Sequence, residues 1–129
     1  MMRSRLIVPN SLRPSTDGFA LSIRLPWYRT LPLSTIGLPV VKLNGTSITQ
    51  GGITLEVNGK SFDEATLSLA ANEWWYVLDE AILRISGTKL TTGLEYDITV
   101  EVAFAPPYIP EITLLCGASQ RMSLQRVEA

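Results

Sequence analysis

The sequence contains no histidine, and this absence excludes several kinds of active site. Histidine is the side chain that most readily exchanges protons near neutral pH, and it is the commonest metal ligand. A chain without it cannot build a Ser-His-Asp or Cys-His nucleophile of its own. A zinc site of the usual Cys/His type is excluded as well, since the only cysteine is Cys116. We therefore expect no catalytic residue, no metal and no other cofactor in this chain.

Neither basic nor acidic side chains are in large excess, and this balance limits the kinds of partner that the chain could bind. The formal net charge is −1, from 11 basic and 12 acidic side chains spread over 129 residues. No basic stripe is present to hold phosphates, so no nucleic acid is expected as a partner. No apolar run approaches membrane-spanning length, and residues 1–14 lack the apolar core of a signal peptide. Because the lone Cys116 cannot form an internal disulfide, we expect a cytoplasmic protein with no membrane partner.

Apolar side chains are plentiful. Hydrophobic residues make up 46% and charged residues 18% of a chain whose length suits one domain. Such a composition leaves apolar surface over after the core is filled, and a partner chain is the expected place for some of it.

Strand periodicity and hairpin signals predict the fold. Residues 94–104 (LEYDITVEVAF) alternate apolar and polar side chains, as do residues 18–25. Asn44-Gly45 and Asn58-Gly59 are two-residue hairpin signals. Asp63 opens a stretch that favours a short helical turn or a loop leading into a strand. The whole pattern predicts an all-β protein, an antiparallel β-sandwich of about 7–9 short strands.

The predicted organisation has three parts. An N-terminal arm covers residues 1–17, the β-sandwich domain covers residues 18–116, and an extended or short helical tail covers residues 117–129. Within the arm, Leu6–Val8 is an apolar trio that could pair with a sheet edge of this chain or of a neighbour.

Residues 18–34 (GFALSIRLPWYRTLPLS) are the most unusual stretch of the chain. In its second part, Pro26 and Pro32 fix φ and lack a backbone donor, so this part is predicted to be a stiff extended loop. Exposed loops rarely carry so many large apolar and aromatic side chains. Either the loop folds back as a plug on its own core, or another protein covers it. Aromatic and arginine enrichment is also typical of interface hot spots.

The candidates for a partner interface or an active-site rim come from this loop and from three other places. The aromatic stretch 73–78 is predicted as a strand, so its two tryptophans must face opposite sides and one lies outside the core. Prolines at 106–110 (PPYIP) hold a tyrosine on a stiff segment. The two arginines that bracket the loop could bind a carboxylate across an interface, stack on a ring or form a salt bridge within the sheet. The set is Arg24, Trp27, Tyr28, Arg29, Leu31, Leu33, Trp74, Trp75 and Tyr108.

Carboxylates are the remaining acid–base groups. Asp63-Glu64 and Asp79-Glu80 are adjacent pairs in turn-like stretches, and Glu95, Asp97 and Glu101 share the outer face of the long predicted strand. Three such acids could hold a hard cation, but no loop of the EF-hand kind accompanies them. Solvated surface charge is the favoured interpretation of all these groups.

The sequence also resembles a known family. RLPWYRTLPLS at residues 24–34, a following Asn-Gly hairpin, the Trp74-Trp75 pair and the late PPYIP resemble the small β subunit of bacterial C-glycoside deglycosidases. The resemblance covers about residues 18–110. Members of this family belong to two-subunit enzymes that cut the carbon–carbon bond between a sugar and a flavonoid-type aglycone.

That resemblance implies a division of labour between two chains. The partner would be a larger TIM-barrel catalytic α subunit, which holds a divalent metal such as manganese and catalytic histidine and carboxylate residues. The substrate would be a C-glycoside whose sugar is already in the 3-keto form. The present chain would be an inactive accessory subunit of this carbon–carbon lyase, stabilising the α subunit and helping to close its active site.

Two other functions remain open at this point. Trp27, Tyr28, Trp74 and Trp75 could form the stacking platform of a stand-alone carbohydrate-binding module. A homo-oligomeric structural protein would also bury the surplus apolar surface.

Overall fold

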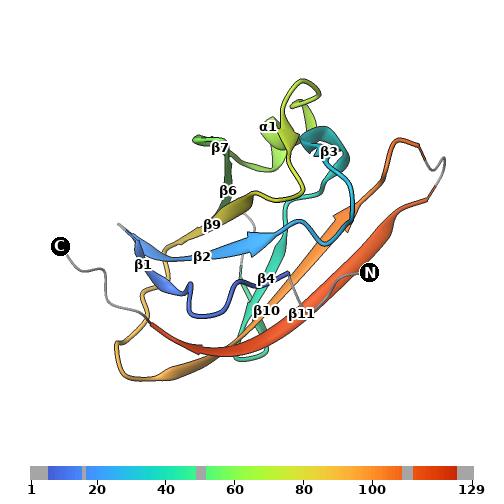
Figure 1. Ribbon diagram of the computed structural model, residues 1–129. Coiled ribbons are helices and arrows are strands. Elements are labelled where there is room, and N and C mark those ends of the chain that lie inside the picture. Colours follow the sequence, from blue (N-terminus) through green and yellow to red (C-terminus); the bar gives the residue numbers. More distant parts are fainter. Residues whose placement is uncertain (1–5, 16, 49–51, 109–111, 125–129) are drawn as a thin grey trace.

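Two antiparallel sheets pack against each other and enclose the hydrophobic core (Figure 1). The computed structural model describes residues 6–15, 17–48, 52–108 and 112–124. The first sheet has the order β1 (Arg13–Ser15), β2 (Gly18–Arg24), β9 (Glu80–Ser86), β6 (Ile53–Val57) and β7 (Lys60–Phe62). The second has the order β11 (Leu114–Ser123), β10 (Glu95–Phe104), β4 (Val40–Leu43) and β5 (Thr46–Ser47).

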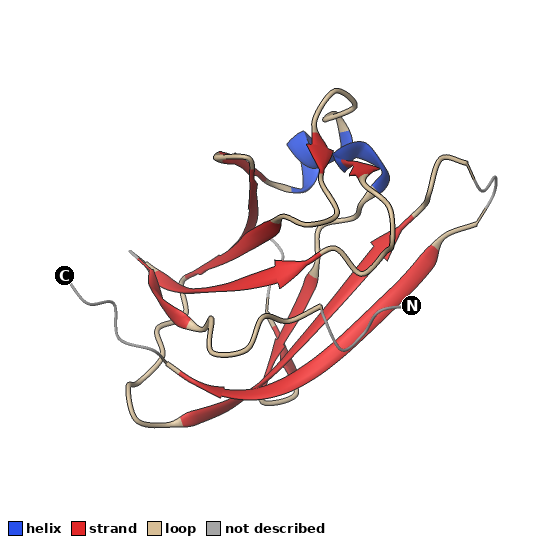
Figure 2. Ribbon diagram, viewed as in Figure 1, coloured by secondary structure: helices blue, strands red, loops and turns tan. Residues whose placement is uncertain are grey.

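A third, small sheet lies at one end of the sandwich. It pairs β3 (Leu31–Pro32) with β8 (Trp74–Trp75). Figure 2 shows it beside the helices, which are α1 (Glu64–Ser68) and a 3₁₀ helix (Leu33–Thr35). The predicted all-β antiparallel sandwich is confirmed. The described residues form eleven strands, more than the number predicted, because three of them have only two residues and leave no periodic pattern.

The long strand predicted from alternation is β10. Its inward side chains Ile98, Val100, Val102 and Phe104 are buried, and its ten residues pair with β11 along their whole length. Leu94, which the alternation assigned to the inner face, is 54% exposed because it precedes the first paired residue.

The prediction of a C-terminal tail from residue 117 is wrong for residues 117–123. They form the second half of β11, which continues to Ser123. Gly117, Ala118 and Ser119 have low strand propensity, so only pairing with β10 makes them a strand. Residues 125–129 of the expected tail lie outside the described residues.

Residues 6–15 belong to the sandwich rather than to a separate arm. Ile7 forms an antiparallel bridge with Ile23. Leu6 and Leu12 are fully buried in the core. The expected pairing of the apolar trio with a sheet edge therefore takes place within this chain.

Both Asn-Gly hairpin predictions are confirmed. Asn44 and Gly45 have φ angles of 50° and 85°, and Asn58 and Gly59 have 55° and 76°. Positive φ at both central residues is the geometry of the tight hairpin turn that suits twisted strands. These turns connect β4 to β5 and β6 to β7.

The short helical turn expected after Asp63 is α1. The Asp63 carboxylate accepts hydrogen bonds from the backbone N–H and the hydroxyl group of Thr66, both at 2.9 Å. These bonds hold the pKa of Asp63 below its ordinary value, because they favour the charged form. Among the described residues, no helix has the length and apolar character needed to cross a membrane.

Candidate functional site

The loop between β2 and β3 is anchored from the inside. Leu25 at the start of the loop and Leu31 and Leu33 after it have no exposed surface. Leu31 pairs with Trp75 across β3 and β8, and the Leu33 N–H donates to the carbonyl oxygen of Glu73 at 2.8 Å. This half of the stretch folds back as a plug. The prediction that Leu31 and Leu33 contact a partner is therefore wrong.

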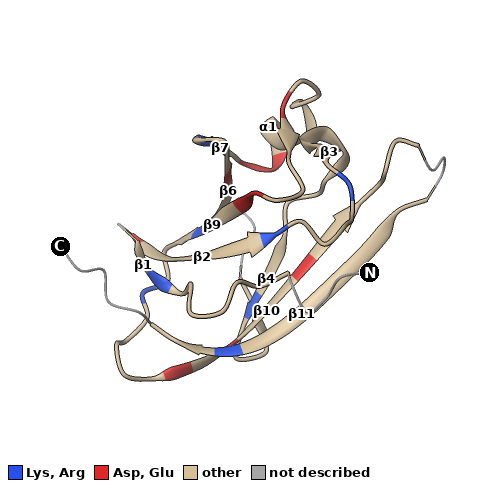
Figure 3. Ribbon diagram, viewed as in Figure 1, with Lys and Arg blue, Asp and Glu red and all other residues tan. Residues whose placement is uncertain are grey.

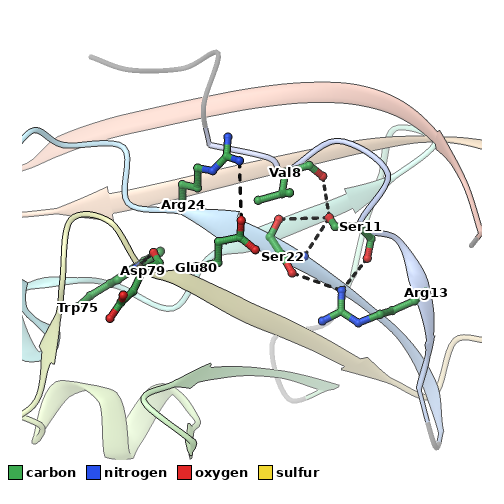
Figure 4. Close-up of polar contacts among 8 residues, drawn as sticks. All are labelled: Val8, Ser11, Arg13, Ser22, Arg24, Trp75, Asp79 and Glu80. Atoms are coloured by element: carbon green, nitrogen blue, oxygen red, sulfur yellow. Dashed lines mark hydrogen bonds and ion pairs between the residues drawn. The ribbon is translucent and has the colours of Figure 1, made fainter. Parts of the chain in front are cut away.

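Trp74 and Trp75 project to opposite sides of β8, as the strand pattern predicts. Trp75 is fully buried, and its indole N–H donates to the carbonyl oxygen of Asp79 at 2.9 Å (Figure 4). Trp74 is 41% exposed. Trp75 is thus a core residue and not part of a partner surface, whereas Trp74 remains a candidate.

Outside the plug, Trp27, Tyr28, Arg29 and Tyr108 form an aromatic–arginine cluster. The Trp27 indole N–H donates to the Tyr108 hydroxyl group, which joins two segments 81 positions apart in the sequence. The ring centroids of Trp27 and Tyr28 are 4.7 Å apart. The Arg29 guanidinium carbon lies 5.8 Å from the ring centroid of Tyr28 and 5.1 Å from that of Tyr108. The two proline-rich stretches therefore make one surface.

Trp27 fixes this cluster to the core. It is partly buried, and its ring centroid lies 5.4 Å from that of Phe104, a buried residue at the end of β10. Tyr28 and Tyr108 project outward and are 58% and 43% exposed. A surface that is already ordered before binding loses less side-chain entropy when a partner arrives.

Arg24 has a partner within its own sheet. Its guanidinium lies 3.7 Å from the Glu80 carboxylate, and the two residues are opposite each other on β2 and β9 (Figure 4). Both side chains are partly exposed, and such ion pairs add little to stability. The salt-bridge alternative therefore describes Arg24, and its contact with a partner stays a prediction.

The loop between β8 and β9 also contributes exposed side chains that were not predicted from the sequence. The Val77 N–H donates to the Thr30 hydroxyl oxygen at 3.0 Å, so this loop runs beside the β2–β3 loop. It exposes 53% of Tyr76 and 87% of Leu78. Both lie in a stretch predicted as strand, but the strand ends at Trp75. The sequence signal that could have identified these two residues is the turn-like Asp79-Glu80 pair directly after the stretch. Residues next to a turn can lie outside the strand pairing.

Together these loops form the surface that we call the loop end. It combines the aromatic–arginine cluster with the exposed side chains of β8 and the β8–β9 loop. Its members are Trp27, Tyr28, Arg29, Trp74, Tyr76, Leu78 and Tyr108.

Acidic side chains on the outer face of β10 have basic partners. The Arg121 guanidinium lies 3.6 Å from Glu95 and 3.1 Å from Asp97, and Lys42 lies 3.2 Å from Glu101. Figure 3 shows acidic and basic residues distributed along both sheets. Within the described part of the chain, no three His, Cys, Asp or Glu residues are grouped so that they could hold a metal ion.

An open hollow of about 580 Å³ lies at the opposite end of the sandwich. The β4–β5 hairpin, Gly52 and residues 86–88 line it. None of these lining residues is an acid, a base or a thiol, so the hollow offers no group for proton transfer.

The aromatic side chains do not form a flat platform for sugar rings. Trp75 is buried, and the planes of Trp27 and Tyr28 are inclined by 40°. Trp27, Tyr28 and Trp75 therefore do not form the stacking platform of the carbohydrate-binding alternative. A β-sandwich with an ordered, exposed aromatic–arginine surface instead has the character of a protein-binding subunit.

Comparison with known proteins narrows this class. Residues 3–108 match the family described as C-glycoside deglycosidase beta subunit, and the chain belongs to this family. The match includes the β2–β3 loop and Tyr108, so the resemblance seen at residues 24–34 is confirmed. The description as a beta subunit implies a partner subunit and hence a hetero-oligomer.

Curated relatives agree with this assignment. The 3'-dehydrocarminate deglycosidase beta subunit of Microbacterium sp. is 37% identical over 110 residues, which cover 85% of this chain and 83% of the relative. A C-glycoside deglycosidase beta subunit of Microbacterium trichothecenolyticum is 31% identical over 109 residues, or 84% of this chain and 82% of the relative. One from Arthrobacter globiformis is 28% identical over 109 residues, with 84% and 83% covered.

Proposed function

We propose that this chain is the noncatalytic subunit of a C-glycoside deglycosidase and that its loop end binds the catalytic α subunit. The observation that carries this proposal is the exposed aromatic–arginine cluster on a loop anchored by buried Leu31 and Leu33. Tyrosine, tryptophan and arginine dominate the binding energy of protein interfaces, and they do so best when already held in place.

The α subunit in this proposal is a larger TIM-barrel chain that supplies the histidine and carboxylate residues. A divalent metal such as manganese is expected there, where it would polarise the substrate ketone. The substrate class is a C-glycoside of a flavonoid-type aglycone with its sugar in the 3-keto form, and one relative is named for 3'-dehydrocarminate. Removal of a proton from the carbon between the ketone and the bond to the aglycone would let that bond break as a carbon–carbon double bond forms in the sugar, and the aglycone carbon would take up a proton; this is a lyase-type cleavage.

This chain would stabilise the α subunit and exclude water from its active site. Burying Tyr76 and Leu78 against the α subunit would remove apolar surface from water and stabilise the complex. Tyr28 and Arg29 would then lie at the rim of the active site. Excluding water there strengthens the electrostatic interactions on which the reaction depends. We place the complex in the cytoplasm, in keeping with the lone buried Cys116.

Expression of this chain and the catalytic subunit of the same organism, separately and together, tests the proposal. We expect the two chains to co-purify, and we expect only the complex to release aglycone from a 3-keto C-glycoside, as followed by liquid chromatography. Aglycone release by this chain alone would contradict the proposal. So would the absence of any complex between the two chains.

A further inference from the structure

We infer that Arg29 binds a carboxylate group of the catalytic partner subunit when the loop end docks. This inference rests on the proposed function and specifies the chemistry of one contact on the partner's surface.

Two aromatic rings hold the Arg29 guanidinium before any partner arrives. Tyr28 approaches it from the same loop, and Tyr108 approaches it from the segment after β10. Contacts of this kind attract a cation to the ring faces. A guanidinium that lies over a ring face can still donate from the N–H groups at its edge. Because Trp27 donates a hydrogen bond to Tyr108, the whole arrangement is tied to the core.

Among the eight described basic residues, Arg29 is one of three with no acidic partner in the described part of the chain. No carboxylate in the described ranges forms an ion pair with it, and no described acceptor receives a hydrogen bond from its guanidinium. Five other basic side chains do form ion pairs, and these are Arg24, Lys42, Lys60, Arg84 and Arg121. The charge on the loop end is therefore uncompensated within the described structure.

An uncompensated charge decides what can cover this surface. Exposed Tyr76 and Leu78 lie on the loop that runs beside the β2–β3 loop, and they favour the burial of the loop end against another protein. Burying a guanidinium without an acceptor costs more than the surrounding apolar contacts return, so the covering surface must supply one. A carboxylate matches the planar fork of arginine with two charge-assisted hydrogen bonds. The occupant is thus an aspartate or glutamate side chain of the partner subunit.

The test is the dissociation constant between this chain and the purified catalytic subunit, measured without substrate at low and high salt. Arg29→Met keeps a long apolar side chain but removes the charge, and we expect it to weaken binding by about 30-fold or more at low salt. Arg29→Lys keeps the charge but not the planar fork, and it should recover only part of that loss. Binding by Arg29→Met should also depend less on salt than binding by the wild type.

Lys89→Met is the matched control. It removes the same charge from an exposed side chain in the turn between β9 and β10, at the opposite end of the sandwich (Figure 1). We expect it to change the dissociation constant by less than about twofold, because it lies away from the proposed contact and salt screens interactions between distant exposed charges. All three variants should melt at the wild-type temperature, since both side chains are exposed.

Three outcomes would overturn the inference. If Arg29→Met binds as tightly as the wild type in a complex that forms and is active, the proposed function stands without the carboxylate contact. If affinity is unchanged but KM rises, the carboxylate belongs to the substrate. Glu111 is an acid three positions after Tyr108 in the sequence. If Glu111→Gln weakens binding as much as Arg29→Met, and the variant with both substitutions binds no more weakly than either alone, the carboxylate belongs to this chain. A wild-type chain that forms no complex would instead refute the proposed function itself.

Discussion

Adjacent tryptophans with opposite environments give the sharpest contrast between single side chains. We expect Trp75→Ala to lower the free energy of unfolding by about 3–5 kcal/mol, because it empties a large buried volume. It also removes the donor of the hydrogen bond to the Asp79 carbonyl group. Trp74→Ala removes a side chain that is 41% exposed, so its effect should stay below about 1 kcal/mol. Urea unfolding of the isolated chain measures both values.

Equal losses from the two substitutions would contradict this assignment of core and surface. A loss for Trp74→Ala as large as that for Trp75→Ala would mean that both side chains are packed inside. The sequence predicted that the pair must divide in this way, but it did not indicate which tryptophan is buried. That depends on which side of the two-residue β8 faces the sandwich, and pairing with Leu31 of β3 decides it.

The β2–β3 loop shows the same limit for side chains outside regular strands. Its proline and aromatic content identified it as part of the most unusual stretch of the chain. Strand periodicity separates inside from outside, but a proline-flanked loop has no such period. Leu31 and Leu33 could therefore not be told apart from Tyr28 and Arg29 by pattern, and only the folded chain places the first two in the core.

Helix α1 carries a capping interaction whose contribution depends on pH. Hydrogen bonds from Thr66 hold the pKa of Asp63 below its ordinary value in the folded chain. A carboxyl group with a lowered folded pKa contributes stability above its unfolded pKa and loses that contribution as pH falls through the folded pKa. We expect wild type to melt above Asp63→Ala at pH 7, and the difference to shrink as pH falls below about 4.

Thermal melts of both proteins between neutral and acid pH measure this difference. Loss of the helix cap alone would lower the melting temperature of the variant at every pH. A difference that stayed constant down to the lowest pH would show that the charged form of Asp63 has no special role in the cap.

Local signals predicted the short-range elements well and the long-range ones poorly. Asn44-Gly45, Asn58-Gly59 and Asp63 fixed two hairpins and a helix from a few neighbouring residues. In contrast, the second half of β11 was missed because its glycine, alanine and serine residues carry no strand signal, and its ladder with β10 supplies the missing stability. Elements that depend on a partner strand cannot be found from their own residues.

The loop end forms only when folding brings together segments that are far apart in the sequence. Trp27 and Tyr108 come from segments 81 positions apart, and the β8–β9 loop reaches Thr30 only through the folded sandwich. Sequence composition predicted surplus apolar surface, and the family resemblance predicted a partner chain. Neither could place Leu78, the most exposed leucine of this surface, because its position depends on where β8 ends.

The most direct test compares two exposed leucines at opposite ends of the sandwich. Leu78 lies on the loop end and is 87% exposed, whereas Leu94 precedes β10 at the far end and is 54% exposed. Each is changed to alanine, and the dissociation constant for the catalytic subunit is measured by calorimetry. We expect Leu78→Ala to weaken binding by about tenfold or more, since burying a leucine contributes about 1.5–3 kcal/mol. Leu94→Ala should leave the dissociation constant unchanged, and the opposite ranking of the two variants would contradict docking through the loop end.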